Sequence, residues 1–132
     1  MSTLENTNAF DYINVLGKAA DAAWLRNDAL VHNIANVNTP GYKRQDVDFE
    51  SVLKRELHNS KYVSMDAKVD HLSTGRLQVG AHTDSAGYSY RLDGNNVDID
   101  TENAELASNQ IRYNGLMDSI NREFQNLQSV MK

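Results

Sequence analysis

Two long stretches of helical apolar spacing, one near each end of the chain, constrain the fold more than any other feature. From about residue 8 to residue 36, apolar positions alternate in steps of three and four, and Asn27 fills one polar slot. The apolar positions of this N-terminal stretch are Ile13, Leu16, Ala20, Ala23, Leu30 and Ile34. The same alternation continues at the other end through Leu106, Gln110, Tyr113, Met117, Ile120, Phe124, Leu127 and Met131. Each pattern predicts one long helix with an apolar stripe.

Neither stripe is stable in water, so we expect the two terminal helices to pack side by side. The sequence therefore predicts a mainly α-helical protein with one helix within residues 1–36 and another within residues 101–132. Asp100 or Thr101 is expected to cap the start of the second helix. Because two helices alone bury little surface, part of each stripe is expected to meet the middle segment or other subunits.

The middle segment, residues 37–100, has a different character. Residues 46–58 place several apolar side chains on roughly one side and predict a short helix. Four of the seven glycines lie between residues 59 and 100, where alternating runs at 76–79 and 88–92 favour strands, with a turn at Asp93–Gly94. The alternative is a segment that is flexible or ordered only by a partner.

A corner is predicted where the first helix ends. Pro40 is the chain's single proline, and it disfavours helical backbone at Thr39 and donates no hydrogen bond itself. Pro40 and Gly41 suit the two central positions of a type II turn, because glycine accepts the positive φ required at the second one. The sequence thus predicts a helix end followed by a fixed change of direction.

Composition and charge exclude several classes of function. The net charge is −5 without a basic patch of interleaved aromatic residues, which argues against nucleic-acid binding. The absence of cysteine excludes disulfides and thiolate metal sites. No apolar stretch approaches the roughly 20 residues that span a bilayer, and the polar N-terminus does not resemble a cleavable signal. If the protein works outside the cytoplasm, we expect export by a route that needs no such signal.

No residue pattern predicts an enzyme or a cofactor site. The four histidines lack metal-ligand spacing, and the adjacent pair Asp70–His71 is a poor acid–base arrangement because neighbouring residues rarely point at one target. The acidic run at residues 93–102 partly resembles a calcium loop, but Val97 and Ala104 occupy positions that should carry polar or acidic ligands. We expect neither catalysis nor a bound metal.

The segment HNIANVNTPGYKRQDVDFESVL, residues 32–53, resembles the N-terminal signature of bacterial flagellar rod and hook axial proteins. The matching residues are Asn33, Ile34, Ala35, Asn36, Thr39, Pro40, Gly41 and Tyr42. The C-terminal stretch from residue 93 resembles the short proximal rod proteins of that family, which lack the inserted outer domains of the distal rod and hook proteins. The resemblance covers the two ends of the chain and leaves the centre unmatched.

The resemblance implies a structural subunit of the basal-body rod. In that family the terminal helices pair as an antiparallel coiled coil that lines the rod's inner tube, and residues 37–100 form the outer layer. Subunits assemble helically above the membrane ring, transmit torque, and contact other rod proteins, the ring and its rod adaptor. The resemblance also implies passage through the flagellar type III export apparatus and a place in the cell-envelope rod without insertion into the membrane.

Three alternatives remain open from the sequence. The chain can be another proximal rod protein of the same family. It can be a free coiled-coil adaptor that binds one partner helix with its exposed stripe. The third is a small calcium-dependent module built on residues 93–102.

Overall fold

The computed structural model describes residues 9–72, 74–83 and 97–131, and the chain is mainly helical over these ranges. The elements in chain order are helix α2 (Ala9–Ala35), strand β1 (Gln45–Asp46), helix α3 (Phe49–His58), helix α4 (Met65–Asp70), the 3₁₀ helix η1 (Thr74–Leu77), strand β2 (His82–Thr83) and helix α5 (Ile99–Met131). The long helices at both ends and the short helix between them confirm the prediction of a mainly α-helical chain.

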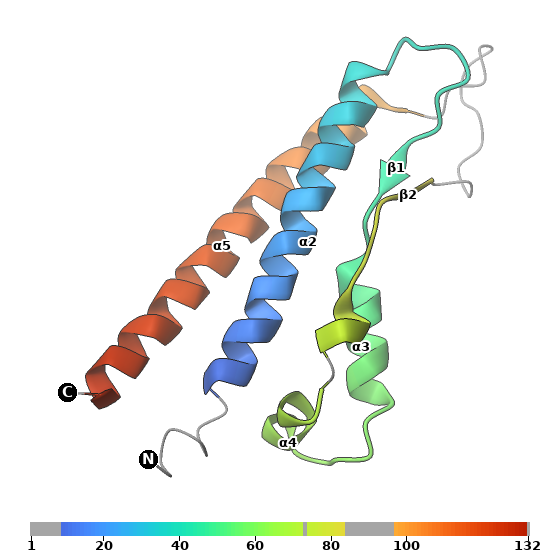
Figure 1. The fold of residues 1–132 in the computed structure, drawn as a ribbon. Coiled ribbons are helices and arrows are strands. Elements are labelled where there is room, and N and C mark those ends of the chain that lie inside the picture. The colour runs from blue at the N-terminus through green and yellow to red at the C-terminus, as the bar shows by residue number, and fades with distance from the viewer. Residues whose placement is uncertain (1–8, 73, 84–96, 132) are drawn as a thin grey trace.

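The two long helices lie side by side and run in opposite directions, so that the start of α2 and the end of α5 lie at the same end of the molecule (Figure 1). Small buried side chains on α2, Ala20 and Ala23, allow close approach, while Leu30 is fully buried near the other end of the helix. The residues predicted for the apolar stripe of α2 are all buried or partly buried.

The middle segment forms a second layer along one flank of α2 (Figure 1). A small core joins Ala22 of α2 to Val47, Phe49 and Leu77, and further apolar side chains pack around it. Strands β1 and β2 pair in antiparallel register, with Gln45 opposite Thr83. This layer covers one flank of α2 and leaves the opposite flank uncovered among the described residues.

The details of the middle differ from the sequence prediction. The short helix begins at Phe49 rather than Asp46, because the Asp48 side chain accepts a hydrogen bond from the Ser51 N–H and caps it. The strand predicted at residues 76–79 is wrong, since Leu77 lies buried in η1 and completes the small core. Helix α4 and the two short strands were not predicted. The strand at 88–92 and the turn at Asp93–Gly94 lie outside the described residues.

The start of α5 is capped by a residue other than the two predicted. The Asp98 side chain accepts hydrogen bonds from the Asp100 N–H at 3.1 Å and from the Thr101 hydroxyl at 3.2 Å. The helix therefore begins at Ile99, two residues earlier than expected. An aspartate just before the first turn is favoured because it satisfies donors that have no partner within the helix.

Candidate functional site: a polar junction and an apolar flank

The corner after α2 is a turn closed around Gly41. The Tyr42 N–H donates to the Thr39 carbonyl at 3.2 Å, and Gly41 has a φ of 76°. A closing hydrogen bond across four residues together with positive φ at the third is the geometry expected of a type II turn with proline at its second position. The predicted turn is confirmed, and it redirects the chain from α2 to β1.

The polar residues of the NIANVNTPGY segment finish the helix before the turn begins. Asn36 Nδ2 donates to the His32 carbonyl at 2.8 Å, while its Oδ1 accepts from the Thr39 hydroxyl at 3.0 Å. The Thr39 N–H also donates to the Asn36 carbonyl at 3.0 Å. These bonds satisfy groups that the end of a helix leaves open. Asn36 and Thr39 thus stabilise the end of α2 through local hydrogen bonds.

Hydrogen bonds of the Asn33 side chain join α2 to β1. Its buried side chain donates from Nδ2 to the Gln45 carbonyl at 2.8 Å, and its Oδ1 accepts from the Gln45 N–H at 2.8 Å. The same Oδ1 accepts from the Tyr42 hydroxyl at 3.0 Å, and Nδ2 reaches Glu102 Oε2 at 3.1 Å. All four hydrogen-bonding positions of the amide are therefore used. One side chain joins α2, the corner, β1 and α5.

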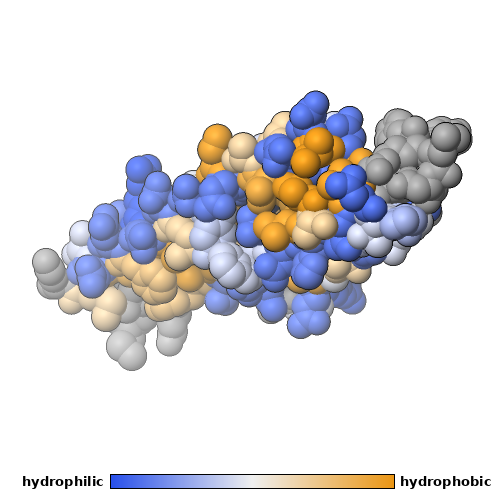
Figure 2. Space-filling view, turned by 90° about the horizontal axis from the view of Figure 1, so that it is seen from above, coloured by the Kyte–Doolittle hydropathy of each residue, from blue (hydrophilic) through white to orange (hydrophobic). Residues whose placement is uncertain are grey.

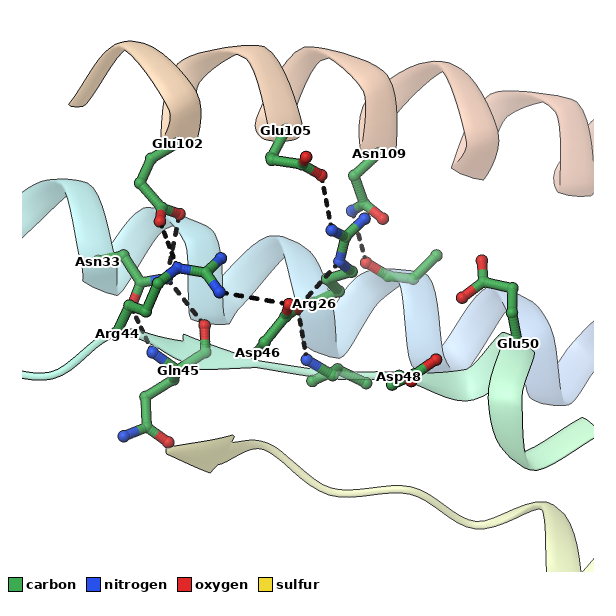
Figure 3. A network of polar contacts seen from close by, with 12 residues as sticks. Arg26, Asn33, Arg44, Gln45, Asp46, Asp48, Glu50, Glu102, Glu105 and Asn109 are labelled. Atoms are coloured by element: carbon green, nitrogen blue, oxygen red, sulfur yellow. Dashed lines mark hydrogen bonds and ion pairs between the residues drawn. The ribbon is translucent and has the colours of Figure 1, made fainter. Parts of the chain in front are cut away.

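Charged side chains extend this contact along the helices (Figure 3). Glu102, only 1% exposed, accepts from Arg44 Nε at 2.6 Å, and Arg44 also reaches Asp46 at 3.4 Å. Asp46 accepts from Arg26 Nε at 3.1 Å, and Arg26 Nη2 donates to Glu105 at 2.7 Å. Positive and negative groups alternate, so every charge in the series has an opposite neighbour. We call this set, from Arg26 and Asn33 through Tyr42–Asp46 to Glu102 and Glu105, the polar junction.

The surroundings keep the groups of the junction in definite protonation states. Burial raises the pKa of Asp46, but hydrogen bonds from the Val47 N–H and Arg26, together with the charges of Arg26 and Arg44, outweigh it and lower the pKa below its ordinary value. Burial disfavours the charged form of Arg26, yet Glu105 and Asp46 leave its pKa raised. Burial and the nearby Glu102 charge raise the pKa of Tyr42. The Arg26–Asp46 pair is therefore ionised at neutral pH, and the Tyr42 hydroxyl keeps its proton.

Most of the junction escaped the sequence analysis, although a signal for it was present. Arg26 and Asn33 lie seven residues apart on α2, and Glu102 and Asn109 lie seven apart on α5. Polar residues at heptad spacing, next to an apolar stripe, indicate a polar contact line between helices. The resemblance singled out Asn33 and Tyr42, and the structure brings these two together with the charged residues.

The apolar stripe of α5 is rotated relative to the prediction. Of the predicted contact residues, Leu127 is buried and Leu106, Tyr113 and Ile120 are partly buried, but Met117 and Phe124 are 37% and 48% exposed. These residues were predicted for helix packing or for assembly, and the exposed Met117 and Phe124 stay predictions for contacts between subunits. Other positions of α5 that are buried or partly buried are Glu102, Asn109, Leu116 and Glu123. The junction explains the rotation, because Arg44, Asn33 and the Ala23 carbonyl all take polar partners from this side of α5.

The rotation leaves an apolar surface on the side of the helix pair away from α3. Arg112 contacts Glu50 of α3, which places the row at 110, 117, 124 and 131 on the other side of α5. Trp24 of α2 meets Tyr113 of α5 with ring centroids 6.0 Å apart, so both helices contribute to this surface. We call it the outer flank; its exposed apolar residues are Phe10, Trp24, Val31, Met117, Phe124 and Met131. Figure 2 shows hydrophobic residues gathered into patches that hydrophilic residues border.

Neither a cluster of metal ligands nor a membrane-spanning helix is present in the ranges that the structure describes. No group of three or more His, Asp or Glu side chains there could hold a metal ion. In the acidic run at 93–102, Asp98 serves as a helix cap, and residues 93–96 lie outside the described residues. None of the helices described is long and apolar enough to cross a membrane.

A helical structural protein is the class that this fold and its two surfaces define: one flank of the helix pair is fixed by polar contacts, and the other presents apolar side chains. No family model matches the chain. It is 36% identical to the flagellar basal body rod protein FlgB of Bacillus subtilis, over 90% of this chain and 92% of the relative. The FlgB protein of Escherichia coli is 31% identical over 81% of this chain and 83% of its own length. The FlgB protein of Cereibacter sphaeroides is 32% identical over 92% of this chain and 94% of its own length.

The chain belongs to the FlgB family of flagellar basal body rod proteins. The resemblance to the flagellar axial proteins is thereby confirmed, and it extends through the middle segment, which the two end motifs did not cover.

Proposed function

We propose that this chain is a structural subunit of the proximal rod of the bacterial flagellar basal body. The similarity to FlgB proteins over about nine tenths of the chain carries this conclusion. The structure supports it with an apolar outer flank that α2 and α5 leave uncovered, because a rod subunit needs surfaces for its neighbours. Its role is mechanical and requires no catalytic residue or cofactor.

The arrangement of the helices supports a finer assignment. We propose that residues 1–36 and 101–132 form the inner coiled-coil domain of the rod, and that residues 37–100 form its outer layer. The side-by-side packing of α2 and α5 along most of their length supports the first part. The position of β1, α3 and α4 on one flank of α2 supports the second, since that flank is then closed to other helices.

The proposed partners follow from this division. The outer flank contacts neighbouring rod subunits, either copies of this chain or other rod proteins, and the base of the rod contacts the membrane ring through its adaptor. In this arrangement the rod surrounds the export channel and transmits torque. The subunit reaches the cell-envelope rod through the type III export apparatus. Many weak apolar contacts repeated between subunits suit a shaft under load better than a few strong ones.

The test is deletion of the gene in a motile host, followed by electron microscopy of isolated basal bodies. We expect cells without rods, hooks or filaments, and recovery when the gene is returned on a plasmid. Assembly of normal basal bodies in the deletion strain would reject the proposal. It would favour the free coiled-coil adaptor, which also has a use for the outer flank.

A further inference from the structure

The contact of α4 with the start of α2 is separate from both the polar junction and the outer flank. Helix α4 lies at the end of the molecule where α2 begins, away from the corner that follows α2 (Figure 1). It has six residues, of which Val69 is the one that is buried. A helix this short is not stable by itself and depends on its contacts with the rest of the chain. Its polar contacts with α2 therefore matter for how firmly it is held.

Two acidic residues of α4, spaced one helical turn apart, contact adjacent residues of α2. The Tyr12 hydroxyl donates to Asp66 Oδ1 at 2.6 Å. That hydrogen bond, burial and the charge of Asp66 raise the pKa of Tyr12, so its hydroxyl remains a donor. One turn further along α4, the Asp70 side chain lies within hydrogen-bonding range of Asp11, which is also an acid. Two ionised carboxylates only accept hydrogen bonds and repel each other, so this contact is favourable when one of them carries a proton.

The surroundings of Asp11 favour that proton. Burial raises the pKa of Asp11, and so do the hydrogen bond and the charge of Asp70, whereas the charge of His71 lowers it; the net result is a raised pKa. Among the described residues, Asp70 and His71 are the charged groups that act on Asp11. His71 Nε2 lies 3.6 Å from Asp70 Oδ2, and its ring stacks on Tyr62 with the centroids 4.0 Å apart. The stacked ring thus keeps His71 on the far side of Asp70 from α2.

We propose that a proton shared between Asp11 and Asp70 controls how firmly α4 is held against α2. In acid, the shared proton turns the repulsion between the two carboxylates into a hydrogen bond, and α4 is held at both of its acidic residues. When the proton is lost at higher pH, the carboxylates repel and the hydrogen bond from Tyr12 to Asp66 opposes release. This inference does not depend on the proposed function as a rod subunit.

The direction of the effect follows from the two states of α4. The pKa of Asp11 is raised while α4 contacts α2 and returns to its ordinary value when α4 is released. The contact is therefore strongest below the ordinary carboxyl pKa of about 4 and weakens as the pH rises through the raised value. This is the opposite of the acid effect expected for a carboxylate that is paired with an arginine. Acid thus tightens this end of the outer layer.

The first test measures amide hydrogen exchange of the purified full chain, corrected for the effect of pH on the intrinsic exchange rate. We expect the amides of residues 66–71 to be at least twofold better protected at about pH 4.5 than at about pH 7. Helix α3, in the same layer, is the internal reference and should change less than twofold. Equal protection of α4 at both pH values, or the same gain in α3, would overturn the proposal.

The second test replaces the proton by an amide. Asp11→Asn provides a donor for Asp70 at every pH, so the protection of α4 at neutral pH should rise at least twofold and its ratio between the two pH values should fall to about one. Asp21→Asn, the same change at an exposed position of α2, should keep the wild-type ratio. A wild-type ratio in Asp11→Asn would show that this pair does not carry the proton.

The third test changes the other member of the pair. Asp70→Asn should also bring the ratio to about one, because an amide on either side replaces the shared proton. It also keeps the proposal testable if Asp11→Asn disturbs the first turn of α2. Loss of the pH dependence in Asp11→Asn with full retention in Asp70→Asn, or the reverse, would mean that the two residues do not share a proton and would overturn the proposal.

Discussion

The two flanks of α2 differ in the way that they bind their surroundings. The flank toward β1 is covered, and its contact at the end near the corner depends on hydrogen bonds and ion pairs of Arg26 and Asn33. The outer flank carries Trp24 and Val31 and is open. Polar contacts require one geometry, whereas apolar contacts tolerate several. The covered flank therefore combines a small apolar core with polar contacts that allow one arrangement, whereas the outer flank has no such polar contacts to fix a partner, and we propose that it meets other chains.

The largest effect is expected from breaking the polar junction at its most buried charge. Glu102→Gln keeps the shape of the side chain but removes the charge opposite Arg44, and we expect a loss of about 3–5 kcal/mol in the free energy of unfolding. Asp118→Asn, on an exposed position of α5, serves as the control and should change it by less than about 0.5 kcal/mol. Urea denaturation of both variants measures the difference. Equal stabilities would show that the junction does not hold the layer in place.

A second prediction compares Leu127 and Phe124, two residues near the end of α5, for their effects on folding stability and on motility. Leu127 is buried against the rest of the chain, so Leu127→Ala should cost roughly 2 kcal/mol or more of folding stability. Phe124→Ala, on the outer flank, should cost less than about 1 kcal/mol but impair motility more. Thermal unfolding and swimming assays on both variants provide the readout. If Phe124→Ala leaves swimming unchanged in cells that still produce the protein, Phe124 and its part of the outer flank have no role in assembly.

The turn offers a smaller and more local test. A Cβ at Gly41 would meet no atom within 4 Å apart from Gly41 itself and its two chain neighbours, so the cost of Gly41→Ala comes from the positive φ, about 1 kcal/mol. Gly115→Ala, in the middle of α5 and equally free of contacts, should instead stabilise the protein by roughly 0.5–1 kcal/mol. Opposite signs for the same substitution would confirm the turn geometry. A stabilising Gly41→Ala would contradict it.

Acid should weaken the polar junction through Asp46. Its pKa is lower in the folded chain than in the unfolded chain, so the unfolded state binds a proton first as the pH falls. The contribution of Asp46 is therefore complete above the ordinary carboxyl pKa of about 4, and is lost as the pH falls through the lowered folded-state pKa. Asp46→Asn should reduce the acid dependence of stability below about pH 4, measured by urea unfolding at several pH values. An unchanged dependence would mean that Asp46 is not held as described.

The sequence predicted what depends on local backbone chemistry and on regular spacing. The long helices follow from heptad spacing, and the corner follows from Pro40 and Gly41, whose backbone preferences do not depend on distant residues. The orientation of α5 could not be predicted in the same way. It depends on hydrogen bonds of Glu102 and Asn109 to partners on α2 and at Arg44, just before β1, which are far away in the chain. The prediction of a strand at 76–79 was wrong because burial of Leu77 in the small core outweighed the local preference for a strand.

The hydrogen bonds between Asn33 and Gln45 in the polar junction also oppose aggregation through strand β1. In an antiparallel pair, the backbone groups of alternate residues point away from the partner strand and are free to pair with another chain. Strand β1 has β2 on one side, and on the other the Asn33 amide occupies both backbone groups of Gln45. An asparagine side chain thus protects this strand edge. A subunit that packs among neighbours at high local concentration can then associate through its helices without growing a β-sheet from this position.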